Sequence, residues 1–259
     1  MTVYILSENT ASPHFLAEHG LSRFIEHKGK KILFDTGASD VFLKNAKKFN
    51  LNIDEADMII LSHGHWDHGN GLKYLKSKPL IAHPGIFKKR YGKKTSEYIG
   101  INSDFDELNA KFKLNLSSKP VKITEQIIFL GEIPRLNDFE AQTTDYIDDK
   151  GHEDFVIDDS ALALIQNGEL IIITACSHSG VCNIIEYAKK VTGINTVKAI
   201  TGGFHLKYRN SQTFKTIECL KKQKIKHIMP SHCTMLPALT AFYDEFAVKQ
   251  IKTGMKLNF

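Results

Sequence analysis

The chain of 259 residues is poor in cysteine, contains one tryptophan and has no long run of apolar residues. Its four scattered cysteines, Cys176, Cys182, Cys219 and Cys233, are too few for the disulfide framework of a small secreted protein, so we expect reduced thiols. No segment approaches the roughly 20 consecutive apolar residues that a membrane span needs. The opening MTVYILSENT lacks the charged start and the long apolar core of a signal peptide. We therefore expect a cytoplasmic protein with no membrane partner.

A strong charge of either sign is also lacking. Lysine and arginine number 34, and aspartate and glutamate 29, so the positive excess is small. It suits an anionic small-molecule substrate. The densest basic segments, residues 88–94 and 221–226, contain one aromatic residue, Tyr91, and no nucleic-acid-binding motif, so we interpret them as solvated faces. Nucleic acid is not an expected partner, and the sequence defines no oligomeric state.

The order of apolar segments predicts an α/β protein. Strands are expected at residues 3–6, 22–27, 31–35, 58–61, 79–84, 121–132, 161–166, 169–175, 197–203, 225–232 and 251–257. Helices are expected at residues 41–49, 67–77, 181–191, 212–222 and 235–246. A single domain over residues 1–259 is expected, with an insertion at about 85–140 that acts as a lid over the site.

The segment LSHGHWDHGNGL, residues 61–72, places three histidines and an aspartate within six positions, directly after an apolar strand. Four such polar groups beside a buried strand carry a desolvation cost that a metal ion relieves. Imidazole and carboxylate are both ligands of zinc. In extended chain His63 and His65 point the same way, whereas Asp67 and His68 fall where a helix begins. We expect the first pair to bind one ion and the second pair to bind a neighbouring ion.

Polar clusters recur at the ends of the other apolar strands. They are Asp35, His63, the ACSH segment 175–178, the GGFH segment 202–205 and the PSHC segment 230–233. Strands that deliver polar side chains to one edge of a layered α/β fold are a common way of building a catalytic site.

The motif His63-x-His65-x-Asp67-His68 resembles the signature of the metallo-β-lactamase superfamily. The resemblance implies a four-layer αβ/βα sandwich. It further implies that Asp35 orients the metal site from behind the ligands and that His232 is the last histidine ligand. With His65 in place of a glutamate at its position, the sequence resembles the hydrolytic members and departs from the flavin-linked di-iron branch.

One position departs from the family pattern. Most relatives supply a histidine and then a bridging aspartate from the second half of the chain, whereas this strand ends in Cys176, Ser177 and His178. We take His178 as the replacement ligand, with Cys176 or His205 as alternatives. Without the shared carboxylate, one tight ion and a weak or vacant second position are expected. The cofactor is expected to be Zn²⁺, one or two ions, with Mn²⁺, Fe²⁺ or Mg²⁺ as alternatives.

A subfamily resemblance adds further candidates. The segments AEHGLS (17–22), ACSHSGVCNIIEYA, GGFHL and SHC resemble a branch that includes an archaeal synthase of methanopterin biosynthesis, which joins a dihydropterin methyl diphosphate to a ribofuranosylaminobenzene phosphate. Glu18 and His19 lie in these motifs as candidates for substrate contact, or else brace the turn at Gly20. Asp67 and His205 are the candidate catalytic residues.

These observations favour a metal-dependent hydrolase, in which a zinc-bound water has its pKa lowered to about 7. Phosphoesters or cyclic esters are its expected substrates. The alternative from the subfamily is the pterin transferase, and a third is an RNA-processing nuclease, which the short, modestly basic insertion fits less well. An exported antibiotic-degrading lactamase is disfavoured by the missing export signal. A metal-binding module without activity is the non-enzymatic alternative.

Overall fold

The structure is a computed structural model that describes residues 1–259. The chain divides into two compact units. Unit 1 comprises residues 1–118, 145–154 and 251–259, and unit 2 comprises residues 119–144 and 155–250. The single domain that the sequence predicts over residues 1–259 stays a prediction. No helix is long and apolar enough to cross a membrane.

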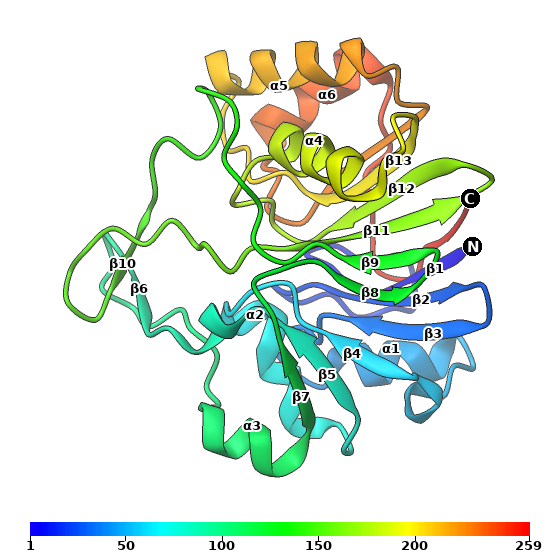
Figure 1. The fold of residues 1–259 in the computed structure, drawn as a ribbon, viewed down its shortest axis with the longest axis vertical. Helices are drawn as coiled ribbons and strands as arrows, with labels where there is room; N and C mark the ends of the chain where they lie inside the picture. The colour runs from blue at the N-terminus through cyan, green and yellow to red at the C-terminus, as the bar shows by residue number, and fades with distance from the viewer. The chain divides into compact units, whose positions relative to one another are not determined.

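Unit 1 is built on a seven-stranded sheet of order β15-β1-β2-β3-β4-β5-β7 (Figure 1). Its strands are β1 (Thr2–Ser7), β2 (Ser22–His27), β3 (Lys30–Phe34), β4 (Met58–Ile60), β5 (Pro79–Ala82), β7 (Lys113–Leu116) and β15 (Lys256–Asn258). The pairs among β15, β1, β2 and β3 are antiparallel, whereas β3, β4, β5 and β7 run parallel. Because parallel strands end at the same edge, the residues after β3 and β4 are neighbours.

The helices of unit 1 are α1 (Val41–Lys48), α2 (Trp66–Gly69) and α3 (Phe105–Lys111), with 3₁₀ turns at Ile53–Glu55, Asn70–Tyr74 and Pro84–Phe87. Helix α1 places Phe42 and Ala46, one turn apart, in the same apolar cluster as Leu33 of β3 and Ile59 of β4. This packing explains why the 3.6-residue apolar period of residues 41–49 folds as a helix against the sheet.

The helix predicted at residues 67–77 is shorter than expected. It comprises α2 and then the 3₁₀ turn Asn70–Tyr74. The chain packs closely here, because a Cβ added to Gly71 would lie 2.0 Å from the backbone oxygen of Thr36, and one added to Gly69 would lie 2.4 Å from Ile101. The backbone of Thr36 also donates to the carbonyl of His68 at 2.7 Å. These close contacts place the histidine segment directly against the residues that follow β3.

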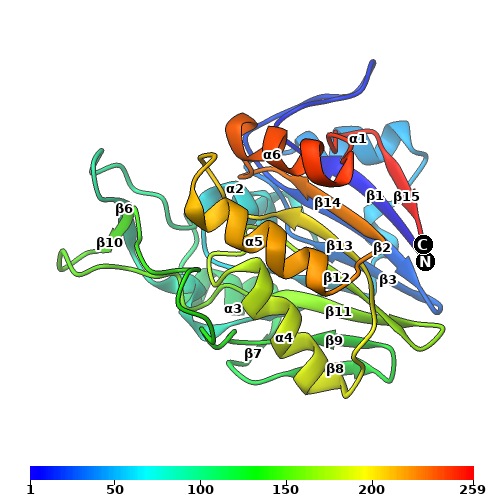
Figure 2. The same ribbon diagram turned by 90° about the horizontal axis from the view of Figure 1, so that it is seen from above.

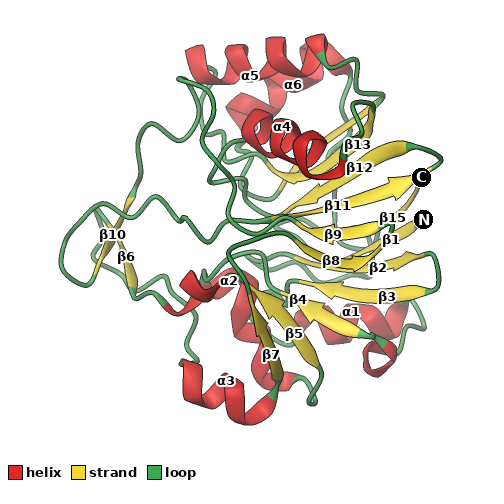
Figure 3. Cartoon of the chain, in the orientation of Figure 1, coloured by secondary structure: helices red, strands yellow, loops and turns green.

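The residues expected to form an insertion, about 85–140, contribute strands to both units, and their role as a lid stays a prediction. Strand β7 pairs with β5 of unit 1, and residues 119–140 supply β8 and β9 to unit 2. Strands β6 (Arg90–Gly92) and β10 (Tyr146–Asp148) form a small two-stranded sheet within unit 1 (Figure 3). The buried Arg90 holds this small sheet, because its Nε lies 3.0 Å from the carboxylate of the buried Asp154.

Unit 2 contains a six-stranded sheet of order β14-β13-β12-β11-β9-β8. The strands are β8 (Val121–Thr124), β9 (Ile127–Phe129), β11 (Ala161–Gln166), β12 (Glu169–Thr174), β13 (Val197–Gly203) and β14 (His227–Ser231). The predicted hairpin turn between β11 and β12 is present, with positive φ at Asn167 and Gly168. Strands β12, β13 and β14 are parallel, so the polar residues after them share one edge of this sheet.

Three helices, α4 (Val181–Thr192), α5 (Ser211–Lys222) and α6 (Leu236–Phe246), lie side by side on one face of this sheet (Figure 2). Ile184 of α4, Leu220 of α5 and Phe242 of α6 belong to one buried cluster with Ile172 and Ile200 of the strands. The predicted helices at 181–191, 212–222 and 235–246 are confirmed. Each amphipathic helix buries its apolar stripe against the face of the sheet. The polar candidate residues lie at the strand ends, outside this apolar layer.

Candidate metal centre

The histidine segment forms a tight turn between β4 and α2, which we call the metal turn, residues 62–68. Gly64 is required at its centre, because an added Cβ would lie 2.1 Å from the backbone oxygen of Ile86. Its carbonyl accepts a hydrogen bond from the backbone of Ile101 at 3.0 Å. All four candidate ligands of the turn, His63, His65, Asp67 and His68, are buried, with at most 6% exposure. Buried polar groups so close together need a common partner.

Asp35 lies behind the metal turn and is completely buried after β3. Its Oδ1 accepts a hydrogen bond from the backbone N–H of Ser62 at 2.7 Å. Its Oδ2 accepts one from the Ser62 hydroxyl at 2.7 Å and lies 2.8 Å from Nδ1 of His68. Asp35 thus contacts both Ser62 and His68, and its role in orienting metal ligands stays a prediction.

This carboxylate defines the tautomers of two histidines. Nδ1 of His68 carries a proton toward Asp35, so its Nε2 is the nitrogen that offers a lone pair. The single hydroxyl proton of Ser62 is donated to Asp35, so the Ser62 oxygen accepts from Nδ1 of His63, 2.8 Å away. The Nε2 of His63 therefore also offers a lone pair. Ser62 is a functional residue that sequence reasoning missed, although it directly precedes the first histidine.

The ligand atoms have the spacing of a metal site. Nε2 of His63 and Nδ1 of His65 lie 3.1 Å apart, and two nitrogens on one tetrahedral zinc lie about 3.3 Å apart for Zn–N bonds of about 2.0–2.1 Å. Nε2 of His68 lies 3.5 Å from Oδ2 of Asp67. Three imidazoles and a carboxylate are a donor set that suits Zn²⁺ and its neighbours in the transition series. The residues present therefore fit a divalent metal.

The electrostatics of the turn favour a positive charge. Burial lowers the pKa of His63 well below its usual range, helped by the charges of His68 and His65, so His63 is in the neutral form that binds metals. Burial also acts against the charged form of His68. The charge of Asp67 and the hydrogen bonds that the carboxylates of Asp35 and Asp67 accept outweigh it and raise the pKa of His68 to about 10. The two carboxylates thus stabilise a cation at this point.

The two substrate candidates of the first segment have different surroundings. Glu18 accepts hydrogen bonds from the Ser7 hydroxyl at 3.0 Å and from the backbone of Ala38 at 3.1 Å, so its carboxylate braces the turn after β3. His19 is half exposed and directs Nε2 to Oδ2 of Asp67 at 3.3 Å. His19 therefore adjoins the metal turn, whereas Glu18 supports the chain beneath it.

A second residue that sequence reasoning missed is Tyr146 of β10. Its ring lies edge-on to the ring of His65, with centroids 4.9 Å apart and an angle of 66° between the planes. The backbone N–H of Trp66 donates to the carbonyl of Ile99 at 3.1 Å in the same region. No local sequence signal places Tyr146 here, because it is 81 positions from His65 along the chain.

In unit 2 the segment Cys176–His178 follows β12. The Ser177 hydroxyl donates to the carbonyl of Gly203 at 2.7 Å, which joins the ends of β12 and β13. His178 is buried, and its ring lies 4.3 Å from that of His205 between centroids. The thiol of Cys233 donates to the carbonyl of Cys176 at 3.4 Å. The structure thus gathers His178, His205 and the residues beside His232 at one edge of the sheet.

Four of the strand-end polar residues have positive φ, a conformation that residues other than glycine rarely adopt. They are Asp35, Ser177, His205 and His232, with φ between 49° and 55°. Such strain persists where the surrounding structure over-determines it and clusters at functional sites. This signal is invisible in the sequence, and it is shared by four of the strand ends on which the candidate residues lie.

Asp159 is a further buried acid that sequence reasoning did not single out. Its Oδ2 accepts from the backbone N–H of Ser179 at 2.9 Å and from the Ser179 hydroxyl at 2.6 Å. Burial raises the pKa of Asp159 to about 6, against these hydrogen bonds. The signal in the sequence was the DDS segment 158–160, directly before the apolar strand β11. Asp159 fixes the residue that follows His178.

A sequence model of the Metallo-beta-lactamase superfamily matches residues 18–189, which include the metal turn and the segment Cys176–His178. An uncharacterized protein of Methanocaldococcus jannaschii is 40% identical over 246 residues, 92% of this chain and 92% of that protein. From the same organism, 7,8-dihydropterin-6-methyl-4-(beta-D-ribofuranosyl)-aminobenzene-5'-phosphate synthase is 36% identical over 271 residues, 94% of this chain and 91% of that protein.

Among solved structures, a crystal structure of a metal-dependent hydrolase of the beta-lactamase superfamily superposes with a TM-score of 0.88 and 27% identity. The match covers 100% of this chain and 99% of that one. The predicted α/β fold of the metallo-β-lactamase type is confirmed.

Proposed function

Because the chain belongs to the metallo-beta-lactamase superfamily, we propose that it is a metal-dependent hydrolase of a phosphorylated or ester small molecule. The observation that carries the proposal is the hydrogen-bonded set Asp35, Ser62, His63 and His68, which prepares two imidazole nitrogens to bind a cation. A merely structural histidine cluster has no need of such a carboxylate behind it.

We assign two groups of ligands to the centre. His63, His65 and His178 form one, and Asp67, His68 and His232 form the other. Zn²⁺ is the proposed ion because the donors are mostly imidazoles. When bound, such an ion lowers the pKa of water and polarises a substrate oxygen. Without the family's bridging aspartate after β12, the second position is expected to bind more weakly.

The chain's own residues contribute orientation and proton transfer. Asp67 is fixed from outside by Nε2 of His19, which lies 3.3 Å from its Oδ2. A carboxylate held in this way can accept a proton at Oδ2 or direct a water molecule. His205 is half-buried and lies against His178, so its ring is within reach of a substrate. We propose that His205 stabilises the negative charge that develops on the substrate, or donates a proton to the leaving group.

The relative at 27% identity supports the hydrolytic reaction, since it is a metal-dependent hydrolase. The synthase at 36% identity supports a phosphorylated substrate, since its name contains a 5'-phosphate. The positive excess of lysine and arginine, 34 against 29 acidic residues, suits an anionic ligand.

A second candidate function is the condensation that the relative at 36% identity performs, judged from its name as a synthase. In that reaction a metal would hold a diphosphate leaving group, and an aromatic nucleophile would take the place of water. The likeness over 94% of the chain favours this candidate.

Two assays on the same metal-loaded preparation separate the candidates. The first follows hydrolysis of bis(p-nitrophenyl) phosphate, and the second follows condensation of a dihydropterin methyl diphosphate with ribofuranosylaminobenzene phosphate. Hydrolysis without condensation supports the proposal and rejects the synthase. Condensation product rejects simple hydrolysis as the function. The His205→Ala variant is the control for both, because it should lose turnover and retain metal.

A further inference from the structure

Two of the four cysteines contact each other away from the candidate metal centre. Cys182 lies in the first turn of α4 and Cys219 in the third turn of α5. The two thiols are close enough for each to shift the pKa of the other, and one turn further along, Gln223 at the end of α5 donates to the carboxylate of Glu186 of α4 at 2.7 Å. Both helices belong to unit 2 and pack side by side on the same face of its sheet (Figure 2). A contact between thiols from neighbouring helices is the starting geometry for a disulfide.

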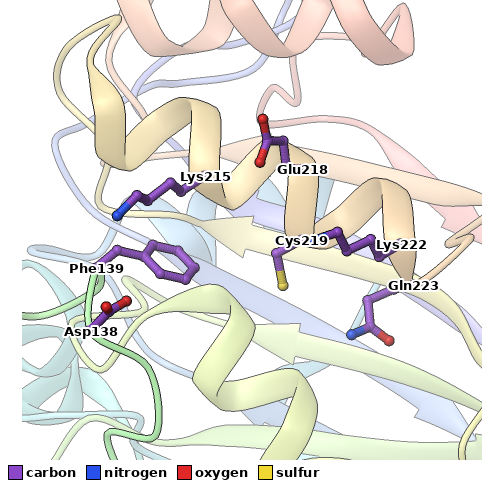
Figure 4. Close-up of a pocket in the computed structure, with 7 residues that line it drawn as sticks. All are labelled: Asp138, Phe139, Lys215, Glu218, Cys219, Lys222 and Gln223. Atoms are coloured by element: carbon purple, nitrogen blue, oxygen red, sulfur yellow. The ribbon is translucent and has the colours of Figure 1, made fainter.

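The two thiols differ in access to solvent. Cys182 is 3% exposed, whereas Cys219 is half-buried and lines a pocket on the surface of α5. Figure 4 shows the Cys219 side chain leaving α5 on the side of α4, below the pocket residues Lys215 and Lys222. Phe139 closes the pocket on one side, with Lys215 Nζ 5.8 Å from its ring centroid. A small solute can therefore reach Cys219 from solvent. Cys182 is buried, so a solute does not reach it directly.

The surroundings give the thiols different chemistry. The interaction with Cys182 lowers the pKa of Cys219, and Lys189 also contributes, so Cys219 is the more nucleophilic partner. The same interaction raises the pKa of Cys182, as do burial and the nearby carboxylate of Glu140. Glu140 accepts a hydrogen bond from the backbone of Cys182 at 3.0 Å, so a proton acceptor lies beside the buried thiol.

We propose that Cys182 and Cys219 form a redox-sensitive modification site that takes a small hydroperoxide, with Cys219 as the attacking thiol and Cys182 as the resolving thiol. The pocket admits the oxidant, and the contact between α4 and α5 supplies the second sulfur. This site is independent of the proposed metal chemistry, because none of its residues is a proposed ligand.

The reaction balances in two steps. The Cys219 thiolate attacks the outer oxygen of the hydroperoxide, the O–O bond breaks, and the leaving alkoxide or hydroxide takes a proton, which leaves a sulfenic acid on Cys219. The Cys182 sulfur then attacks the Cys219 sulfur, and water leaves. The proton of Cys182 passes to the Glu140 carboxylate and from there to the departing hydroxide, which leaves as that water. Two thiols are oxidised to one disulfide, and one hydroperoxide is reduced to an alcohol or to water.

The link would bind the first turn of α4 to α5. That turn directly follows the segment Cys176–Gly180, and its backbone N–H groups at Cys182 and Asn183 are held by Glu140 at 3.0 Å each. A covalent bond at this point would add a second restraint to the same turn.

The other cysteine pair is an internal comparison. Cys233 and Cys176 are also neighbours, with the Cys233 thiol 3.4 Å from the Cys176 carbonyl, but neither residue lines the pocket beside α5. If access through the pocket decides reactivity, the pair on α4 and α5 oxidises first.

The test treats the metal-loaded, reduced full chain with increasing hydrogen peroxide, blocks remaining thiols with iodoacetamide, and maps the peptides by mass spectrometry without reduction. The expected result is a peptide carrying Cys182 joined to one carrying Cys219, which dithiothreitol separates. A disulfide between Cys176 and Cys233 formed first, or no disulfide before irreversible sulfinic acid at Cys219, overturns the proposal.

Two matched variants assign the roles. In Cys182→Ser, oxidation should stop at a sulfenic acid on Cys219 that dimedone labels. In Cys219→Ser, the buried Cys182 should stay reduced at the same peroxide concentration. Dimedone labelling of Cys182 in the second variant reverses the assignment and contradicts the pocket argument. The wild-type peptide map stands by itself if either variant fails to fold.

Discussion

The carboxylate of Asp35 contacts the Ser62 hydroxyl at 2.7 Å and Nδ1 of His68 at 2.8 Å. One buried residue thereby orients two candidate ligands without being one itself. In metal sites, partners of this kind are worth roughly 10–100-fold in metal affinity or activity. The proposed importance of Asp35 follows from these hydrogen bonds. They are not visible in the sequence, where only the family resemblance pointed to Asp35.

The substitution Asp35→Asn tests this role. The amide nitrogen would face the N–H of His68, which favours the tautomer that carries its proton on Nε2 and cannot bind a metal there. We expect Zn²⁺ affinity to fall by about 10–100-fold in competition with a chromophoric chelator. Asp54→Asn is the control, since that carboxylate is exposed and pairs with Lys76. Equal affinity of Asp35→Asn and wild type would remove Asp35 from the centre.

The metal turn depends on the close approach of two backbone segments. Gly64 has no room for a side chain, because an added Cβ would lie 2.1 Å from the backbone oxygen of Ile86. A backbone neighbour cannot move aside as a flexible side chain can. We expect Gly64→Ala to destabilise the metal-free protein by about 1–3 kcal/mol, measured by urea unfolding. If Gly64→Ala unfolded at the same urea concentration as the wild type, the metal turn would tolerate a side chain at this position and the packing argument would be wrong.

Helix α4 begins at a buried carboxylate. Glu140 accepts hydrogen bonds from the backbone of Cys182 and Asn183, and thus satisfies two N–H groups that the helix cannot satisfy itself. We expect Glu140→Ala to lower the free energy of unfolding by about 1–3 kcal/mol, because buried donors lose their acceptor. Glu186→Ala, an exposed position of the same helix, should change it by less than about 0.5 kcal/mol. Equal effects of the two variants would contradict this role for Glu140.

Over the whole molecule, most strands and helices could be predicted from the sequence. The hairpin of β2 and β3 with its turn at Lys28-Gly29, and that of β11 and β12 with its turn at Asn167-Gly168, are encoded locally by alternating apolar residues and turn chemistry. The helices α4, α5 and α6 follow from the helical spacing of their apolar residues. These features depend on residues that are close together in the sequence, so one sequence is enough to predict them.

Features that depend on distant contacts could not be predicted. Tyr146 contacts His65, and Arg90 pairs with Asp154, only because β6 and β10 pair across more than fifty residues. The helix expected at 67–77 gives way to a 3₁₀ turn because Gly71 packs on Thr36, which lies in another segment. Strand β7 could not be predicted for the same reason, since so short a strand is stabilised by its sheet partner β5.

His178 is the ligand that we propose from the second half of the chain. His178 and His205 lie together at the end of unit 2's parallel strands, with ring centroids 4.3 Å apart. We assign metal binding to His178 and turnover to His205. We therefore expect His178→Ala to lower the metal content, and His205→Ala to retain metal with reduced activity. Loss of metal in His205→Ala would transfer the ligand role to His205.

The most direct test of the central claim is the metal content of protein purified without chelators, measured by inductively coupled plasma mass spectrometry beside the thermal midpoint. Wild type should carry one tightly bound divalent ion, with a second in weaker occupancy. His63→Ala should lose that ion and show a lower midpoint, because bound metal stabilises the folded state. A metal-free wild-type preparation that is catalytically active, or a His63→Ala variant with wild-type metal content and midpoint, would contradict the account.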